Sequence, residues 1–470
     1  MSITRKIVNK LPLITLIITS IIVYIILLLC SKDNDMYFEI ASGRDLLNGE
    51  FFNATHLNNY PLIVQQWLYS VILALVDKLG DFGIFTFVFI QNLLLWLVSS
   101  IFIYRKTKNK KKAIIGSYIA TFISYYYMIS IRPQIITVIM LIVELILVDM
   151  YKEKHNIKYL LSIFPLLILY ANMHQSLFLY SIFVIIPFYI DIDKSKHILK
   201  CIDWKLVWFS FLFLLCSLCT PYGLDGSLYV VKALFSDGFK YIGIKELQPL
   251  PITNIIGVSI IIILAIVIYK IYKKQSNYYV NYYIFSLTIL SFISVRHLCI
   301  WYIALMFMFC YFDFTGFKKN YIYIITIIIS IFLIVGQFKK IDFTKQYGNI
   351  ELAIPDKDAR IYNSIIDIGG WLEYNDFTKI KFDSRIEVFS KEMSNNPTLI
   401  DTLLDCIHGY HVNKNKTYSI ASDDILISLA NEYDYFIIKP TDYINKVLEH
   451  HNWLKIYDKN NMIIFKNPTN

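Results

Sequence analysis

The sequence is dominated by apolar blocks about twenty residues long, which is the length an α-helix needs to cross the hydrocarbon core of a membrane. Such blocks, bounded by Lys-rich or polar breaks, occupy residues 11–30, 82–104, 113–131, 134–151, 158–172, 175–190, 206–220, 251–272, 279–295, 298–315 and 321–337. Of the 470 residues, 56% are hydrophobic and only 17% are charged. We therefore predict an α-helical polytopic membrane protein with about eleven transmembrane helices.

The distribution of Lys and Arg predicts the orientation of these helices, because positive residues collect in short cytoplasmic loops. The run at 11–30 is interpreted as a retained first helix and the segment 63–79 as an interfacial helix. With the N-terminus inside, every basic cluster then falls on a cytoplasmic loop. The clusters are Arg105 to Lys112; Lys152, Lys154 and Lys158; Lys194, Lys196, Lys200 and Lys205; Lys270, Lys273 and Lys274; and Lys318 with Lys319. We expect a multi-pass plasma-membrane protein with a cytoplasmic N-terminus. Its net charge of +9 requires no nucleic-acid partner, since these loops account for much of it.

The composition changes after residue 337 to that of a soluble segment long enough for one small domain. Strands are predicted at 359–364, 379–382 and 434–439, followed by a helix with Thr441 or Asp442 as N-cap and a hairpin at 453–466. We predict a transmembrane domain at 1–337, including an acidic first outer loop at 31–81. Residues 338–470 are expected to form an extracytoplasmic α/β domain.

The first outer loop is unusually rich in charge, since it carries Asp33, Asp35, Glu39 and Arg44 close to the membrane. A short surface helix is predicted at 45–48, between Gly43 and Gly49. Dense charge in a loop beside a membrane is typical of a functional segment.

Other polar and ionisable residues, not counting the Lys and Arg of the inner loops, also fall on the predicted outer half of the protein. Ionisable groups near a membrane boundary mark substrate sites or anchors. Two alternatives stay open, because Arg132 also suits a lipid-headgroup anchor and His174 also suits a hydrogen-bonded packing residue. The candidates beyond the first loop are Arg132, Asn172, His174, Glu246, Arg296 and His297.

Carboxylates mixed with Arg and His suit chemistry on a phosphate-linked substrate beside a reacting hydroxyl. Asp35 is the candidate general base, and Asp33 with Asp35 could hold a divalent cation such as Mg²⁺ or Mn²⁺. Arg44, Arg132 and Arg296 would neutralise a phosphate leaving group. The competing interpretation is that these residues form structural ion pairs that hold the outer loops together.

The order of these motifs resembles that of bacterial polytopic proteins similar to the GT-C superfamily of glycosyltransferases. The matching residues are Asp35-Met36-Tyr37-Phe38-Glu39 with Gly43, Trp67-Leu68, Arg132-Pro133-Gln134, Asn172-Met173-His174, Pro221-Tyr222-Gly223, Glu246-Leu247-Gln248-Pro249, Arg296, Gly369-Gly370-Trp371-Leu372 and Phe382-Asp383-Ser384-Arg385. Two positions depart from the group, which usually has His at Glu39 and often has Glu at Gln66.

The resemblance implies transfer of a sugar from a polyprenyl-phosphate-linked donor to a surface glycan, lipid or protein on the outer face. A first-loop acid would act as base, and Glu39, Arg44, Gln66 and the outer polar residues would contact the substrates. Two other functions stay open. A transporter or flippase for a lipid-linked saccharide predicts ionisable groups along the whole path, for which Glu144 is the main candidate within the membrane. A membrane scaffold with an outer partner-binding domain would tolerate loss of the first-loop acids.

Overall fold

The computed structural model describes residues 34–50, 63–128, 131–193, 198–235, 248–275, 277–312, 350–365, 368–382, 406–407, 410–412, 418–420 and 423–469. These residues form two compact units. The first contains residues 79–224 and the described residues from 248 to 312. The second contains the described residues from 34 to 78, residues 225–235 and those from 350 onward.

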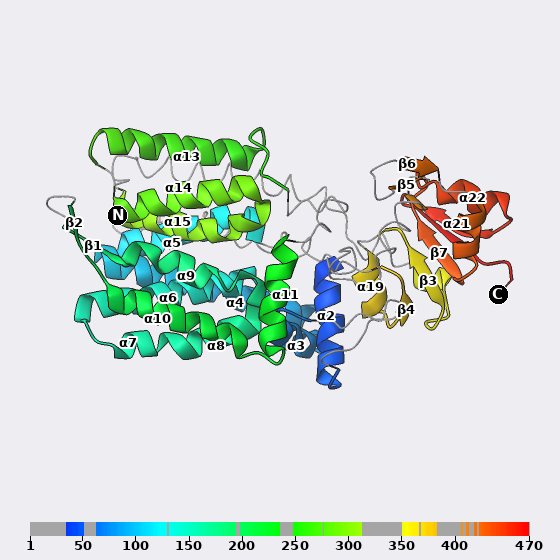
Figure 1. Ribbon diagram of the computed structural model, residues 1–470, viewed down its shortest axis with the longest axis horizontal. Helices are drawn as coiled ribbons and strands as arrows, with labels where there is room; N and C mark the ends of the chain where they lie inside the picture. The colour runs from blue at the N-terminus through cyan, green and yellow to red at the C-terminus, as the bar shows by residue number, and fades with distance from the viewer. Residues whose placement is uncertain are drawn as a thin grey trace, which may run out of the picture. The chain divides into compact units, whose positions relative to one another are not determined.

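The first unit is helical, and in Figure 1 its longer helices lie side by side. Helix α4 packs against α5 and α6, α6 packs against α8, and α14 packs against α13 and α15. A short antiparallel pair, β1 with β2, joins η2 to α10. The elements are α4 (Gly80–Thr107), α5 (Lys110–Met128), α6 (Gln134–Lys154), α7 (Lys158–Leu161), α8 (Ile163–His174), η1 (Gln175–Leu177), α9 (Tyr180–Ile185), η2 (Ile186–Phe188), β1 (Ile190–Asp193), β2 (Ile198–Ile202), α10 (Trp204–Leu214), η3 (Leu215–Leu218), α13 (Ile255–Tyr272), α14 (Tyr278–Ile293), η5 (Val295–Ile300) and α15 (Trp301–Tyr311). Helix α11 (Gly223–Phe235) begins with the last two residues of the segment 79–224, and its residues from 225 onward belong to the second unit.

Helices occur at every predicted apolar run that the described residues include, whereas the runs at 11–30 and 321–337 lie outside them. Within the described part, three helices are long and apolar enough to cross a membrane, namely Gly80–Thr107, Gln134–Lys154 and Lys158–Leu177. Trp204–Leu218 and Gly223–Lys232, bent by 104°, would together make a fourth. The described helices therefore indicate an integral membrane protein, and the total of about eleven spans stays a prediction.

Ion pairs gather at the C-terminal end of α6. They join residues of the predicted cytoplasmic clusters to acids on α6 and at the start of α10. The pairs are Lys106–Asp149, Arg105–Glu153 at 2.8 Å and Lys152–Asp203 at 3.1 Å. Helix α6 has 21 residues and is therefore about 30 Å long, which matches the hydrocarbon thickness of a bilayer. The charged end of α6 and its N-terminal end thus lie about one membrane thickness apart.

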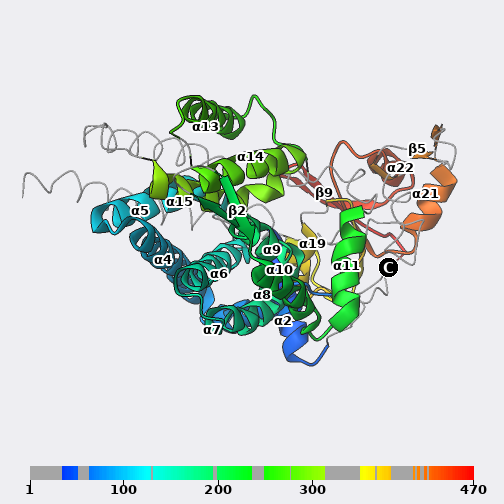
Figure 2. The same ribbon diagram turned by 60° about the vertical axis from the view of Figure 1, so that its left-hand side comes forward.

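The second unit contains a five-stranded mixed sheet in the order β4-β3-β7-β9-β8. Figure 2 labels its strand β9 and the helices α21 and α22 of the same unit. Strands β4, β3 and β7 are parallel, and β9 runs antiparallel to both β7 and β8. This confirms the predicted α/β character of the C-terminal segment. The elements are α18 (Ile350–Ala353), β3 (Arg360–Asn363), α19 (Gly369–Tyr374), β4 (Lys379–Ile380), β5 (Tyr410–Val412), β6 (Tyr418–Ile420), α21 (Asp423–Ala430), β7 (Tyr435–Ile438), α22 (Ile444–His450), β8 (Leu454–Lys459) and β9 (Met462–Lys466).

The core of this sheet lies around β7, whose four residues are all buried. Tyr362 of β3 stacks on Phe436 of β7 with ring centroids 4.6 Å apart, and α21 and α22 supply further apolar side chains to the same cluster. The predicted N-cap of α22 was wrong, since the helix begins at Ile444 with Tyr443 in the cap position. The buried Asp442 carboxylate instead accepts hydrogen bonds from the Ser364 hydroxyl and, at 2.9 Å, from the Lys439 amide. It thereby joins the ends of β3 and β7.

The first loop also belongs to the second unit. Its described residues form α2 (Asn34–Leu47) and α3 (Trp67–Asp77), which pack against each other, and α2 also packs against α19. The prediction of a short helix at 45–48 was wrong, because α2 runs for 14 residues and passes straight through Gly43. The sequence grouped this loop with the membrane helices, whereas in the structure it packs with the C-terminal residues.

Candidate functional site

The approach of α2 to α3 depends on the absence of a side chain at Gly43. A Cβ atom at this position would lie 2.1 Å from the Ser70 carbonyl oxygen and 2.8 Å from the Ala74 Cβ. Glycine usually weakens a helix interior, but here it lets the backbone of α3 come into contact with α2. Close packing with α3 therefore explains why the helix continues through Gly43.

One turn before Gly43, the Glu39 carboxylate is buried between the same two helices. Glu39 is only 4% exposed and accepts hydrogen bonds from the Gln66 side-chain amide and the Ser70 hydroxyl. A buried carboxylate needs such donors, because desolvation without them would cost several kcal/mol. Gln66 and Glu39, both expected substrate contacts, thus bind each other. Asp35 lies one turn earlier on α2 and is partly exposed, whereas Asp33 lies outside the described residues.

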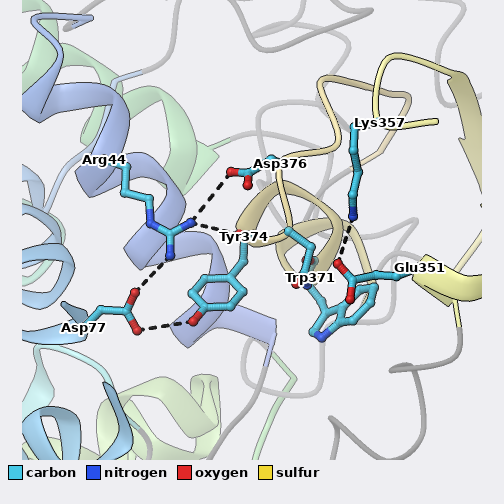
Figure 3. Close-up of polar contacts among 8 residues, drawn as sticks. Arg44, Asp77, Glu351, Lys357, Trp371, Tyr374 and Asp376 are labelled. Atoms are coloured by element: carbon cyan, nitrogen blue, oxygen red, sulfur yellow. Dashed lines mark hydrogen bonds and ion pairs between the residues drawn. The ribbon is translucent and has the colours of Figure 1, made fainter. Parts of the chain in front are cut away.

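Arg44 lies near the other end of α2 and connects three segments (Figure 3). Its guanidinium donates to the Asp77 carboxylate of α3 at 2.9 Å and to the Tyr374 carbonyl at the end of α19 at 2.8 Å. It also lies 4.5 Å from the centre of the Tyr374 ring, and its ion-pair distance to Asp376 is 3.8 Å. The expected role of Arg44 at a phosphate stays a prediction, while its observed partners are protein groups.

Tyr374 completes this network through its hydroxyl and its ring. The hydroxyl donates to Asp77 at 3.3 Å, and the ring lies 4.9 Å from that of Tyr37 on α2. Burial and the neighbouring Asp77 carboxylate raise the pKa of the Tyr374 phenol, and Arg44 acts in the opposite direction. The phenol is therefore held in the protonated form that donates to Asp77.

A second polar cluster lies in the first unit, at the N-terminal end of α6. The Nδ1 atom of His174, the last residue of α8, is 2.7 Å from the Thr137 hydroxyl of α6. Arg296 of η5 donates to the Ser176 hydroxyl at 2.9 Å, two positions beyond His174. The structure thus brings His174 and Arg296 together at the end of α6 that lies opposite its ion-paired end.

The remaining candidates of this unit lie close by in the sequence. Asn172 donates to the carbonyls of Ile168 and Cys219, both at 2.8 Å, and His297 pairs with the Tyr180 hydroxyl. Arg132 lies in the turn directly before α6, and Glu246 lies outside the described residues.

The candidates are therefore divided between the two units. Asp35, Glu39, Arg44 and Gln66 belong to the second, whereas Arg132, Asn172, His174, Arg296 and His297 belong to the first. In the part of the chain that the structure describes, no group of three or more His, Cys, Asp or Glu side chains could hold a metal ion.

The sequence did not single out the partners of these residues. Thr137, Ser176 and Tyr180 are common residues within apolar helices, and Tyr374 follows the Gly-Gly-Trp-Leu motif without any pattern of its own. Arg44 and Tyr374 are 330 positions apart, so no local spacing signals their contact.

Glu144, the candidate of the transporter interpretation, lies midway along α6 and is completely buried. Among the described residues, neither of its carboxylate oxygens has a hydrogen-bond partner. No other Asp, Glu, Lys or Arg occurs between Gln134 and Val148 of α6, so this helix supplies a single ionisable group rather than a row of them.

No known family model matches the sequence, and a search of curated proteins finds no match. Solved structures of the archaeal oligosaccharyltransferase AglB from Archaeoglobus fulgidus do match the fold. Its complex with an inhibitory peptide and a dolichol-phosphate has a TM-score of 0.54 and 11% sequence identity, covering 90% of this chain and 69% of the other.

The same coverage is found for two further structures of an Archaeoglobus fulgidus oligosaccharyltransferase. The apo form has a TM-score of 0.52 at 10% identity, and the form tethered to an acceptor peptide through a disulfide has 0.50 at 11%. The chain therefore has an oligosaccharyltransferase-like fold. At this identity the likeness concerns the fold alone and leaves the activity open.

Proposed function

We propose that this protein is an integral membrane glycosyltransferase of the GT-C type. It transfers a sugar from a polyprenyl-phosphate-linked donor to a glycan, lipid or protein acceptor at the outer face of the plasma membrane. The observation that carries the proposal is the fold likeness to an oligosaccharyltransferase over 90% of the chain. That enzyme has been solved with a dolichol-phosphate, which is a lipid phosphate of the expected donor class. The GT-C-like motif order in the sequence is independent of this likeness.

In the proposed reaction, Asp35 accepts the proton of the acceptor hydroxyl or amide as its oxygen or nitrogen attacks the anomeric carbon of the donor. The bond between that carbon and the phosphate oxygen breaks, and the electron pair leaves with the polyprenyl phosphate. Arg132 and Arg296 stay the sequence-based candidates for cationic contacts to the donor phosphate, and His174 and His297 those for further substrate contacts.

The shared unit of the first loop and the C-terminal segment supports the proposed topology. Segments that pack together lie on the same side of a membrane, so the chain between residues 78 and 350 crosses an even number of times. The sequence predicts ten spans in this interval, since only the run at 11–30 precedes it. Both segments are then extracytoplasmic if the N-terminus is cytoplasmic, as proposed.

A divalent cation held by Asp33 and Asp35 belongs to the sequence-based expectation alone. Asp33 lies outside the described residues, and Glu39 accepts hydrogen bonds from Gln66 and Ser70. Binding of Mg²⁺ or Mn²⁺ by Asp33 and Asp35 therefore stays a proposal.

The proposal is tested with purified protein in vesicles that contain a radiolabelled polyprenyl-phosphate sugar and extracted envelope acceptors. Asp35→Asn should abolish transfer without changing the thermal stability of the protein. Glu50→Gln, which makes the same acid-to-amide change at an exposed position of the same loop, should retain full activity. Wild-type rates in Asp35→Asn would remove this residue from the mechanism.

The same vesicles distinguish the transporter alternative, for which the isolated Glu144 is the only support from α6. Movement of the lipid-linked saccharide between leaflets without any transfer, lost in Glu144→Gln and kept in Asp35→Asn, would identify a flippase. That result would refute the transferase proposal.

A further inference from the structure

The first-loop helix α2 is held by two neighbouring helices, α3 and α19. Glu39 and Gly43 face α3, where they meet Ser70. Tyr37 and Arg44, seven residues apart and so about two full turns, lie on one line along the helix, and both contact Tyr374 of α19. Helix α2 is therefore fixed against rotation by contacts near its beginning and near its end.

The contacts of Arg44 close this arrangement. Its two terminal nitrogens donate to Asp77 of α3 and to the Tyr374 carbonyl. The Tyr374 hydroxyl in turn donates to Asp77. The Asp77 side chain is only 10% exposed, so its ion pair with Arg44 is shielded from solvent. The Asp376 side chain is 84% exposed, so its ion pair with Arg44 is not. Arg44 also satisfies a carbonyl at the C-terminus of α19, where a cation is favoured.

We propose that Arg44, Asp77 and Tyr374 form a positioning clamp, which sets the rotation of α2 and thereby the location of Asp35. The effect of the clamp on catalysis rests on the proposed function, whereas its effect on the rotation of α2 does not. Side-chain ends lie about 5–6 Å from a helix axis, so a rotation of about 10° displaces Asp35 by roughly 1 Å. A displacement of that size can reduce a rate about 100-fold.

A positioning role differs measurably from the direct phosphate contact that the sequence suggests for Arg44. A residue that binds the donor phosphate raises the KM for the donor when removed, and Tyr374 would then have no comparable effect. A clamp residue lowers kcat with little change in KM. Arg44 and Tyr374 would then behave as a unit, so that removing both costs little more than removing one.

The experiment uses the full chain in lipid nanodiscs and the variants Arg44→Ala, Arg44→Lys, Tyr374→Ala and Arg44→Ala/Tyr374→Ala. The control is Glu351→Gln, which breaks the exposed Lys357–Glu351 pair that lies apart from the clamp in Figure 3. Both alanine variants should lose about 10- to 100-fold in kcat with donor KM within about twofold of wild type. Arg44→Lys should recover part of the loss, because it keeps a charge for Asp77 but lacks the fork that reaches two acceptors. The control should match wild type.

Hydrogen–deuterium exchange of the α2 peptide amides gives a readout that needs no activity. Exchange should be at least about tenfold faster in both alanine variants and unchanged in the control. Unchanged exchange would overturn the clamp, as would a rise in donor KM confined to Arg44→Ala. If wild-type protein shows no transfer while exchange responds as expected, the proposed function fails and the clamp stands.

Discussion

Replacing Gly43 with alanine should destabilise the first loop, although the same change in an open helix would stabilise it. Alanine improves helix propensity over glycine by about 1 kcal/mol. Here the new Cβ would lie 2.1 Å from the Ser70 carbonyl oxygen, and ordinary contact requires roughly 1.3 Å more. The backbone of α3 cannot yield that space as a flexible side chain could. The two helices must therefore separate, and the sign of the effect reverses.

The separation also strains the bonds from Ser70 and Gln66 to Glu39, since these span the same interface. Overpacking costs about 1–3 kcal/mol, and a weakened hydrogen bond to a buried charge adds about 1.5–3 kcal/mol. After the gain in propensity, we expect a net loss of about 1.5–5 kcal/mol. Even the lower end corresponds to roughly tenfold more frequent opening of α2.

Hydrogen–deuterium exchange on peptides from α2 and α3 measures this loss directly. Leu47→Ala is the matched control, because Leu47 lies on the same helix and is 44% exposed, so its truncation should change stability by about 0.5 kcal/mol or less. Exchange in Gly43→Ala that equals or falls below the wild-type rate would refute the close packing of α2 on α3.

Three further outcomes are expected. Ser70→Ala should destabilise the α2–α3 pair by about 1–3 kcal/mol in thermal unfolding, because the buried Glu39 carboxylate loses a donor; an unchanged melting temperature would contradict this. Asp442→Ala should destabilise the ends of β3 and β7 by about 1–3 kcal/mol, because it removes the acceptor of two hydrogen bonds. Equal hydrogen-exchange protection of these strands in wild type and variant would argue against that role. The folded state raises the pKa of Tyr374. The contribution of this phenol to stability should therefore be fully present below about pH 10 and disappear as the pH rises through the folded-state pKa. The stability difference between wild type and Tyr374→Phe should accordingly shrink above about pH 10. A difference that is constant from pH 8 to pH 11 would count against the buried phenol.

Local patterns in the sequence predicted local structure well. The apolar runs that the described residues include coincide with helices. The segment DYFIIK forms the central strand β7, because four consecutive apolar residues suit a strand buried on both faces. These features depend on neighbours in the sequence, which is why they could be read from it.

The errors arose where a distant partner decides the structure. Gly43 reads as a helix end, yet the α3 backbone makes it a helix interior. Asp442 has the sequence context of an N-cap, yet its carboxylate accepts a hydrogen bond from Ser364, the residue that directly follows β3. For Arg44 the sequence indicated an ionisable site but could not indicate Tyr374 as its neighbour. The roles of the site residues in transfer stay predictions.

The 330 positions between Arg44 and Tyr374 also have a consequence for biosynthesis. At about 5–20 residues per second, the ribosome needs roughly 15–70 s after making α2 to complete α19. During that time α2 lacks its contacts with α19, while the helices between them are still being synthesised. A chain that stalls before the last hundred residues would therefore contain Arg44 and Asp77 without Tyr374. A factor that protects the nascent first loop would bind this same form of the protein.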